Sequence, residues 1–103
     1  MSSGKAKEAR LKPRQERNAK VKIHWHDAYG VLKSAVATSE DVSRTGIKLS
    51  LDKPIPARTL INVQCPDLRL SGVAVVRHCQ RSTVNSYIIG CEFAAGMEWR
   101  EGQ

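Results

Sequence analysis

The sequence predicts an all-β protein: an antiparallel barrel of five to six short strands with a flexible basic arm at its N-terminus. Two observations carry this prediction. Hydrophobic residues make up 41% of the 103 residues but aromatic residues only 5%, so the core must be built mainly from Val, Ile, Leu and Ala. Apolar and polar residues also alternate in short runs bounded by turn residues. The length suits one domain with a single modest core.

The N-terminal segment is polar and lacks an apolar face. Residues 1–22 hold eight Lys or Arg against two Glu, which is +6 of the formal net charge of +7. Pro13 disfavours helix at Lys12, so an extended or mobile arm is expected. The chain is therefore divided into an arm over 1–20 and a barrel domain over 21–103.

The strands follow in order along the rest of the chain. The first run, VKIHW, places Val21, Ile23 and Trp25 on one face, as a half-buried strand requires. A helix is expected only at the end, where 94–103 could form a short one despite Gly96. The runs that predict strands are 21–25, 29–39, 46–51, 59–65, 68–79 and 86–93.

The stretch DVSRTG, residues 41–46, lies directly before the third expected strand. Asp41 and Ser43 are two positions apart, so in an extended chain they project to the same side and can converge on one ligand. Gly46 supplies either a positive φ or room for close backbone approach. Taken alone, the stretch is also explained by an ordinary Asp/Ser turn with a glycine bulge.

Two arginines in the arm are suited to an anionic ligand. Arg10 and Arg14 lie four positions apart on a segment that Pro13 holds extended. Guanidinium binds phosphate oxygens bidentately and stacks on aromatic rings, so such a pair fits a ligand with both phosphates and bases. The alternative is a solvated basic tail. Arg17 lies three positions after Arg14, so Arg14 and Arg17 are an alternative to Arg10 and Arg14 as the pair of arginines.

RxxxR in a basic arm, followed after about thirty residues by DxSxxG at the start of a strand, resembles the signature of the PilZ domain family. The later runs IKLSLDKPIPARTLINVQC, GVAVVRHC and YIIGCEF resemble the successive strands of that family, so the likeness covers roughly residues 10–95. The resemblance implies a six-stranded β-barrel that binds the bacterial second messenger cyclic di-GMP.

The resemblance also implies a role for each motif residue. Arg10 and Arg14 would hold the phosphates and stack on guanine or hydrogen-bond to it. Asp41 would accept hydrogen bonds from guanine N–H groups, and Ser43 would hydrogen-bond the ligand. Gly46 would keep the loop compact against the barrel, so that the two motifs face each other.

Further positions bear on the same ligand. Arg77, in VVRH, could project from a strand toward it, and Arg44 lies within the second motif, although solvated surface arginines are the commoner case. Ala9 precedes the first motif arginine, a position that the resemblance links to the number of ligand molecules bound. Alanine there favours a single cyclic di-GMP.

No catalytic or metal-binding arrangement is expected. His24 and His26 share a strand face, but no third ligand has suitable spacing. Cys65, Cys79 and Cys91 stand alone in apolar contexts, as small core residues do. The sequence therefore predicts a protein that is not an enzyme and that uses no cofactor or metal.

The chain has no apolar run of ~18 residues and no signal peptide, which predicts a soluble cytoplasmic protein. The leading hypothesis is a stand-alone cyclic di-GMP receptor, whose arm orders over the barrel on binding and changes a surface presented to a downstream protein. One alternative is a nonspecific nucleic-acid-binding barrel, although exposed aromatic residues are scarce. Another is a PilZ-fold interaction module without a ligand.

Overall fold

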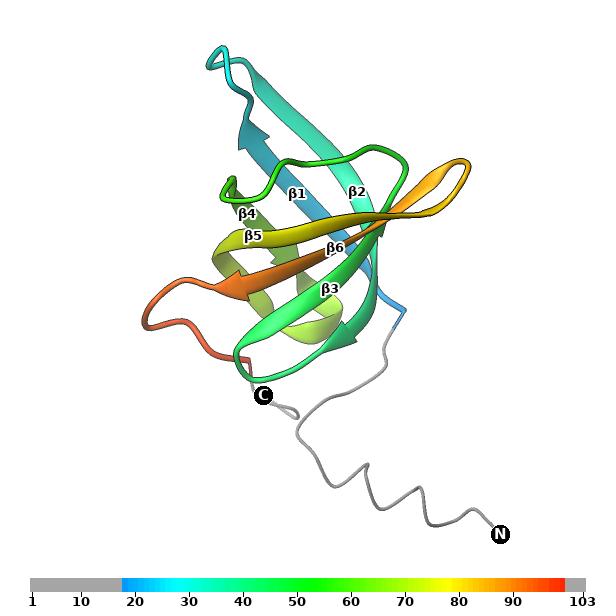
Figure 1. The fold of residues 1–103 in the computed structure, drawn as a ribbon. Coiled ribbons are helices and arrows are strands. Elements are labelled where there is room, and N and C mark those ends of the chain that lie inside the picture. The colour runs from blue at the N-terminus through cyan, green and yellow to red at the C-terminus, as the bar shows by residue number, and fades with distance from the viewer. Residues whose placement is uncertain (1–17, 100–103) are drawn as a thin grey trace, which may run out of the picture.

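The structure, a computed structural model, describes residues 18–99 as a closed β-barrel (Figure 1). All neighbouring strands are antiparallel, and their order around the barrel is β1-β2-β3-β6-β5-β4. The elements are β1 (Lys20–His26), β2 (Leu32–Val42), β3 (Gly46–Leu51), β4 (Leu60–Cys65), the 3-10 turn η2 (Pro66–Leu68), β5 (Leu70–Thr83) and β6 (Ser86–Phe93). The predicted six-stranded antiparallel barrel is confirmed.

Alternation of apolar residues fills the barrel interior. Val21, Ile23 and Trp25 of β1 are all buried, and the outward positions between them are not. The same period of two runs through β3 and β4, because successive side chains of a strand point to opposite faces. Ile55, in the loop between β3 and β4, is fully buried as well and adds to this core. Any ligand site must therefore lie on the outside of the barrel.

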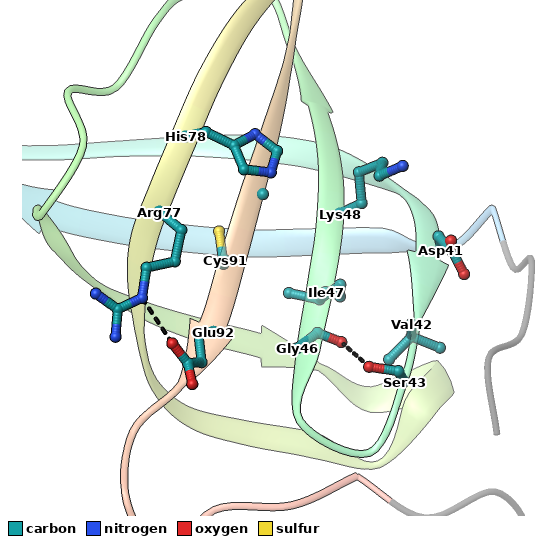
Figure 2. Close-up of a pocket in the computed structure, with 11 residues that line it drawn as sticks. Asp41, Val42, Ser43, Gly46, Ile47, Lys48, Arg77, His78, Cys91 and Glu92 are labelled. Atoms are coloured by element: carbon teal, nitrogen blue, oxygen red, sulfur yellow. Dashed lines mark hydrogen bonds and ion pairs between the residues drawn. The ribbon is translucent and has the colours of Figure 1, made fainter.

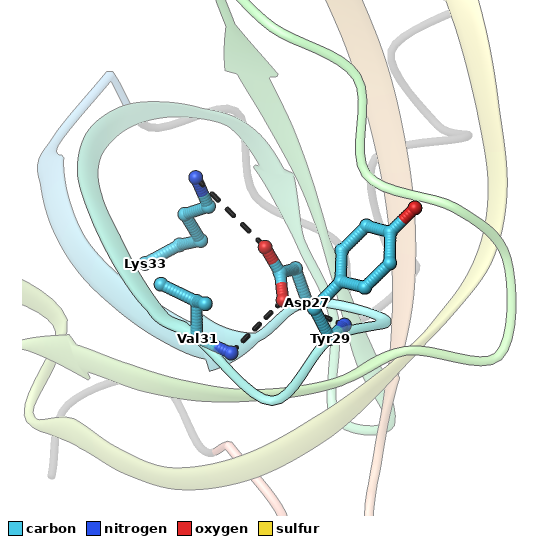
Figure 3. Close-up of polar contacts among 4 residues, drawn as sticks. All are labelled: Asp27, Tyr29, Val31 and Lys33. Carbon is cyan, nitrogen blue, oxygen red and sulfur yellow. Dashed lines mark hydrogen bonds and ion pairs between the residues drawn. The ribbon is translucent and has the colours of Figure 1, made fainter.

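Asp27 closes the turn between β1 and β2 (Figure 3). Its Oδ1 accepts hydrogen bonds from the main-chain N–H groups of Tyr29 and Val31, at 2.8 and 2.9 Å. Lys33 Nζ lies 3.9 Å from Oδ2. The hydrogen bond from Val31 is the main cause that lowers the pKa of Asp27 below its ordinary value. The carboxylate thus orders the turn while it is ionised.

The predicted C-terminal helix is wrong for residues 94–99, where the chain forms a turn. Gly96 has a φ of 87°, and Met97 N–H donates to the carbonyl oxygen of Ala94 at 3.0 Å. Trp99 is only 4% exposed, and its Nε1 donates to the carbonyl oxygen of Leu68 at 2.9 Å. Burial of this indole against η2 outweighs the modest helix propensity of the segment. Residues 100–103 lie outside the described part of the chain.

The arm predicted over residues 1–20 consists largely of residues 1–17, which the structure does not describe. Residues 18 and 19 lead directly into β1. Ala19 N–H donates to Ser39 Oγ at 2.9 Å, and Ala19 O accepts from Ser39 N–H, also at 2.9 Å. Within residues 18–99 there is no helix long and apolar enough to span a membrane.

Candidate functional site

An open cleft of about 350 Å³ lies on the outer surface of the barrel, where β2, β3, β6 and β5 run side by side (Figure 2). The cleft is lined by residues from both ends of the DVSRTG motif, residues 41–46, and from β5 and β6, which come much later in the chain. Its lining residues are Asp41, Val42, Ser43, Gly46, Ile47, Lys48, Arg77, His78, Gly90, Cys91 and Glu92.

A β-bulge turns Asp41 toward this cleft. In the register of β2 with β3, Ser39 is opposite Leu49 and Asp41 is opposite Lys48, so Glu40 is an extra residue. Ser39 and Val42 are both buried, whereas strict alternation from Ser39 would send Asp41 inward. The extra residue shifts the phase of the strand, as bulges near binding sites commonly do. The carboxylate therefore lies on the outer face, directly across from Lys48.

Ser43 and Gly46 close the loop between β2 and β3. Ser43 N–H donates to the carbonyl oxygen of Gly46 at 2.9 Å, and Ser43 Oγ donates to the same oxygen at 3.4 Å. A hydroxyl that donates in this way keeps its lone pairs for a donor on a ligand. The loop is also tied from outside, because Phe93 N–H donates to Thr45 O at 2.8 Å and Trp99 N–H to Arg44 O at 3.0 Å.

Gly46 is needed for close approach and not for an unusual backbone angle. Its φ is not among the positive values, which occur at Gly30, Gly72 and Gly96 among the glycines of the described chain. A Cβ at Gly46 would instead overlap the carbonyl oxygen of Cys91 on β6. Of the two roles that the sequence left open for this glycine, the structure favours the second.

A second bulge, on β5, presents Arg77 and His78 together. Val76 is opposite Cys91 and His78 is opposite Gly90, so Arg77 is the extra residue. Arg77 and His78 are consequently both exposed, although they are neighbours in a strand. Arg77 Nε is 2.6 Å from Glu92 Oε1 on β6. Figure 2 shows this ion pair on one side of the cleft and Asp41 on the other.

His78 lies over the bare backbone of Gly90. A Cβ at Gly90 would meet the imidazole ring at Nε2, Cε1 and Cδ2, so the ring occupies the place of a side chain there. Since His78 is exposed, the ring is accessible from the solvent side as well. In Figure 2, His78 and Lys48 lie between Arg77 on one side of the cleft and Asp41 on the other.

Sequence reasoning missed Lys48, His78 and Glu92. Lys48 could have been found, because it follows Gly46 by two positions and period-two alternation puts both on one face. His78 could not, since alternation from Arg77 predicts the opposite face and the bulge that reverses this has no signal in the sequence. Glu92 is paired with Arg77 through register, which only the fold supplies.

The predicted site residues fall into two groups. Asp41, Ser43, Gly46 and Arg77 all line the cleft. Arg44 is exposed in the same loop but is not part of the cleft lining. The remaining predictions concern Ala9, Arg10, Arg14 and Arg17, which lie outside the described residues.

The other candidates from the sequence have no site around them in residues 18–99. His24 is half-buried and His26 exposed on the outer side of β1, and no group of three His, Cys, Asp or Glu in this part could hold a metal ion. Cys65 and Cys91 are both buried. Burial, with a smaller effect of Cys79, raises the pKa of Cys91 to about 12, so it is a poor nucleophile.

Comparison with known proteins identifies the fold only. No protein-family model matches the chain, and no curated protein matches its sequence. Among solved structures, it is similar to that of MrkH from K. pneumonia, with a TM-score of 0.58 and 16% sequence identity. The match covers 79% of this chain but only 39% of MrkH. The similarity supports the β-barrel fold of this chain.

Proposed function

We propose that this chain is a cyclic di-GMP receptor and not an enzyme, and that the ligand binds in the cleft across β2, β3, β6 and β5. The observation that carries the proposal is that Asp41, Ser43 and Gly46 line one cleft together with Arg77. The resemblance to the PilZ signature and the six-stranded barrel that it implies support the same ligand.

The cleft offers complementary groups for a guanine base and for phosphate. Asp41 accepts from guanine N–H groups, since an ionised carboxylate is an acceptor only. Ser43 Oγ adds a hydrogen bond, and Lys48 brings a positive charge opposite Asp41 for a phosphate oxygen. Cyclic di-GMP is a dianion that carries two bases, so a site with both kinds of group suits it.

Arg10 and Arg14 complete the site in this proposal. The hydrogen bonds between Ala19 and Ser39 fix the start of the barrel against β2, at a residue that lies two positions before Asp41. Arg14 precedes Ala19 by five residues, a span of at most ~16–18 Å of chain. Both arginines can therefore close over a ligand in the cleft, hold its phosphates bidentately and stack on its bases.

His78 provides a platform for the second base. One side of its ring lies against the backbone of Gly90, and His78 is exposed, so the other side is accessible to a base. Stacking of a base on an aromatic ring contributes ~1–3 kcal/mol. His78→Ala is expected to weaken binding, whereas His78→Phe retains the ring and most of the affinity.

The summed interactions are sufficient for a signalling receptor. Charge-assisted hydrogen bonds contribute ~1.5–3 kcal/mol each, and micromolar affinity needs about −8 kcal/mol after the cost of ordering the bound segment. Closure of the arm over the ligand then changes the surface that a downstream protein meets in the cytoplasm.

Calorimetric titration with cyclic di-GMP at about 150 mM salt tests the proposal, with GMP as the control ligand. Wild type is expected to bind with micromolar affinity, and Arg14→Ala and Asp41→Ala each to lose at least tenfold, about 1.4 kcal/mol. Asp67→Ala removes an exposed carboxylate away from the cleft and should bind as wild type does. Absence of heat with wild type would refute the proposal.

Arg77 has two separable roles. It can contact the ligand through its Nη groups, or it can neutralise Glu92 so that the carboxylate does not repel a dianion. Arg77→Ala weakens binding in both cases. Adding Glu92→Gln restores affinity if neutralisation is the role, and leaves it low if contact is.

A nonspecific nucleic-acid-binding barrel is the less favoured function. Trp25 and Phe93 are buried, so they offer no stacking surface. Tyr87 is half-buried, with the Arg81 guanidinium 5.8 Å from its ring centroid. Steep loss of oligonucleotide binding with salt, unaffected by Asp41→Ala, would support this alternative.

A further inference from the structure

The half of β2 nearest the β1–β2 turn is paired on one side only. Residues 32–38 of β2 are paired with β1, but on the other side the pairing with β3 reaches only Thr38, which lies opposite Ser50. β3 then ends at Leu51. Within residues 18–99 no strand pairs with residues 32–36 on that side (Figure 1). We name residues 32–36 the β2 edge.

The ladder with β1 determines which backbone groups of the β2 edge point away from the barrel. Ser39 N–H donates to Ala19 O at 2.9 Å and extends the register of β1 with β2 by one pair. Hydrogen-bonded and non-hydrogen-bonded pairs alternate along an antiparallel ladder, so the odd-numbered residues in this part of β2 face β1. The residues whose N–H and C=O groups face the other way, without a hydrogen-bond partner among residues 18–99, are Leu32, Ser34 and Val36.

A groove of about 480 Å³ runs beside the β2 edge. The rest of its lining comes from the end of β3 with Asp52 and Lys53, and from Asn85 and Ser86 where β6 begins. Its charged lining residues are one acid and one base, and most of the others carry hydroxyl or amide groups or are small. The groove therefore has room for a segment of chain beside the free backbone groups, in surroundings without net charge.

Two exposed aliphatic side chains lie along the same edge. Leu32 is 59% exposed and Val36 is 58% exposed. On the β1 side their cross-strand neighbours are His26 and Lys22, and on the free side they have none. Directly opposite residues of paired strands bring their Cβ atoms within ~4.5–5.5 Å, so an added strand would supply the missing neighbours.

An extended peptide segment matches the backbone groups, the groove and the two aliphatic side chains together. Its main chain can exchange hydrogen bonds with the β2 edge, and β-branched side chains at alternate positions can stand opposite Leu32 and Val36. A segment without net charge suits a groove in which Asp52 and Lys53 balance each other. Because Ser50 already lies opposite Thr38, the edge accommodates about five added residues, ~17 Å of strand.

Other occupants match fewer of these features. Residues 1–17 hold six Lys or Arg against two Glu and include Pro13, which has no N–H to donate. The β2 strand of a second copy would meet the end of β3 in either direction, with its β1–β2 turn if antiparallel and with its C-terminal half if parallel. A lipid surface would leave the backbone groups without partners.

We propose that the β2 edge binds an extended, uncharged segment of another protein by strand addition, with aliphatic side chains at alternate positions of that segment. This site goes beyond the proposed receptor function, because the groove shares no lining residue with the cleft.

The test uses the full chain, labelled with ¹⁵N, and an acetylated and amidated peptide of about eight residues in which valine alternates with serine. Amide shift changes should centre on residues 32–38 and 50–53. Two N-methylated peptides are the controls. When the valines stand beside Leu32 and Val36, their N–H groups face β2 and the serine N–H groups face away. Methylation at every valine should therefore abolish binding, whereas methylation at every serine should leave it.

Variants of the chain test the same contacts from the other side. Val36→Asp replaces an aliphatic neighbour by a charge, and Ser34→Pro removes an N–H that faces the groove, so each should weaken binding at least tenfold, about 1.4 kcal/mol. Leu60→Asp and Val84→Asp are the matched controls, at positions 63% and 77% exposed outside the groove, and should bind as wild type does. Thermal unfolding verifies that each variant folds. Cyclic di-GMP titration of Val36→Asp should match wild type, which separates failure of this site from failure of the cleft.

Hydrogen exchange of the chain gives a second readout. In the free chain the amides of Ser34 and Val36 should exchange faster than those of Ala35 and Ala37, which face β1. The valine–serine peptide should slow exchange at Ser34 and Val36 at least tenfold and leave the other two unchanged.

Three outcomes would overturn the proposal. They are binding of the valine-methylated peptide as strong as that of the serine-methylated one, slow exchange at Ser34 and Val36 in the free monomeric chain, and no binding of the unmodified peptide at millimolar concentration. Concentration-dependent association of the chain that Ser34→Pro abolishes would assign the β2 edge to a second copy instead.

Discussion

Replacing Gly46 by alanine places a methyl group against the main chain of β6. The new Cβ overlaps Cys91 O, and Cys91 C and Glu92 Cα follow at 3.5 and 3.6 Å. These atoms belong to a strand that is hydrogen-bonded on both sides, to β3 and to β5, so they cannot rotate away. Overpacking of this kind costs about 1–3 kcal/mol. In a domain of this size each kcal/mol lowers Tm by ~4–8 °C.

Gly90→Ala is the matched comparison. Its Cβ also meets a close neighbour, but that neighbour is the imidazole of His78, the end of a side chain that can change rotamer. Stability should therefore fall much less than in Gly46→Ala. The cleft changes in both variants, through a displaced loop in Gly46→Ala and a displaced imidazole in Gly90→Ala.

Urea denaturation and thermal unfolding of the two variants and wild type measure the stability difference. Calorimetric titration with cyclic di-GMP on the same samples measures the effect on the cleft, and weaker binding is expected for both variants. The reasoning is refuted if Gly46→Ala unfolds at the wild-type midpoint, or if Gly90→Ala is the less stable of the two.

Three further predictions follow from single contacts. Trp99→Phe keeps the ring but leaves a buried carbonyl without its indole donor, so urea denaturation should show a loss of about 1–3 kcal/mol, and an unchanged midpoint would contradict this. The hydrogen bond from Val31 N–H lowers the pKa of Asp27 in the folded protein. The ionised Asp27 carboxylate therefore stabilises the fold above the unfolded-state pKa of about 3.9, and this stabilisation is lost as the pH falls through the lowered pKa of the folded state. The stability gap between wild type and Asp27→Asn should therefore narrow in acid, and a constant gap would count against it. At about pH 8 a thiol reagent should modify half-buried Cys79 well before Cys91, whose pKa is about 12, as peptide mass spectrometry of the native protein can determine.

The sequence was sufficient for β1, β3 and β4 because their alternation of buried and outward residues is regular. Val21, Ile23 and Trp25 point inward as predicted. The prediction of a C-terminal helix was wrong because helix propensity is a weak local preference. The burial of Trp99 depends instead on η2, about thirty residues earlier.

The cleft was only partly predictable. Asp41, Ser43 and Gly46 could be assigned from one short motif, and Lys48 from its spacing to Gly46. The bulges at Glu40 and Arg77 break the period-two alternation from which the outward or inward direction of a side chain is predicted. No residue type in either strand indicates where these bulges occur. His78 reaches the cleft for that reason, so only the register of β5 with β6 could place it there.

The hydrogen bonds between Ala19 and Ser39 also attach the arginines that precede them in sequence to the barrel. A group tethered by a few residues samples a small volume, which corresponds to an effective concentration in the millimolar range or above. Under the proposed function, Arg10 and Arg14 would therefore need little affinity of their own to engage a ligand that Asp41 and Ser43 already hold. The same residues supplied as a separate peptide, to a chain that begins at residue 18, would have to be added at millimolar concentration to have the same effect.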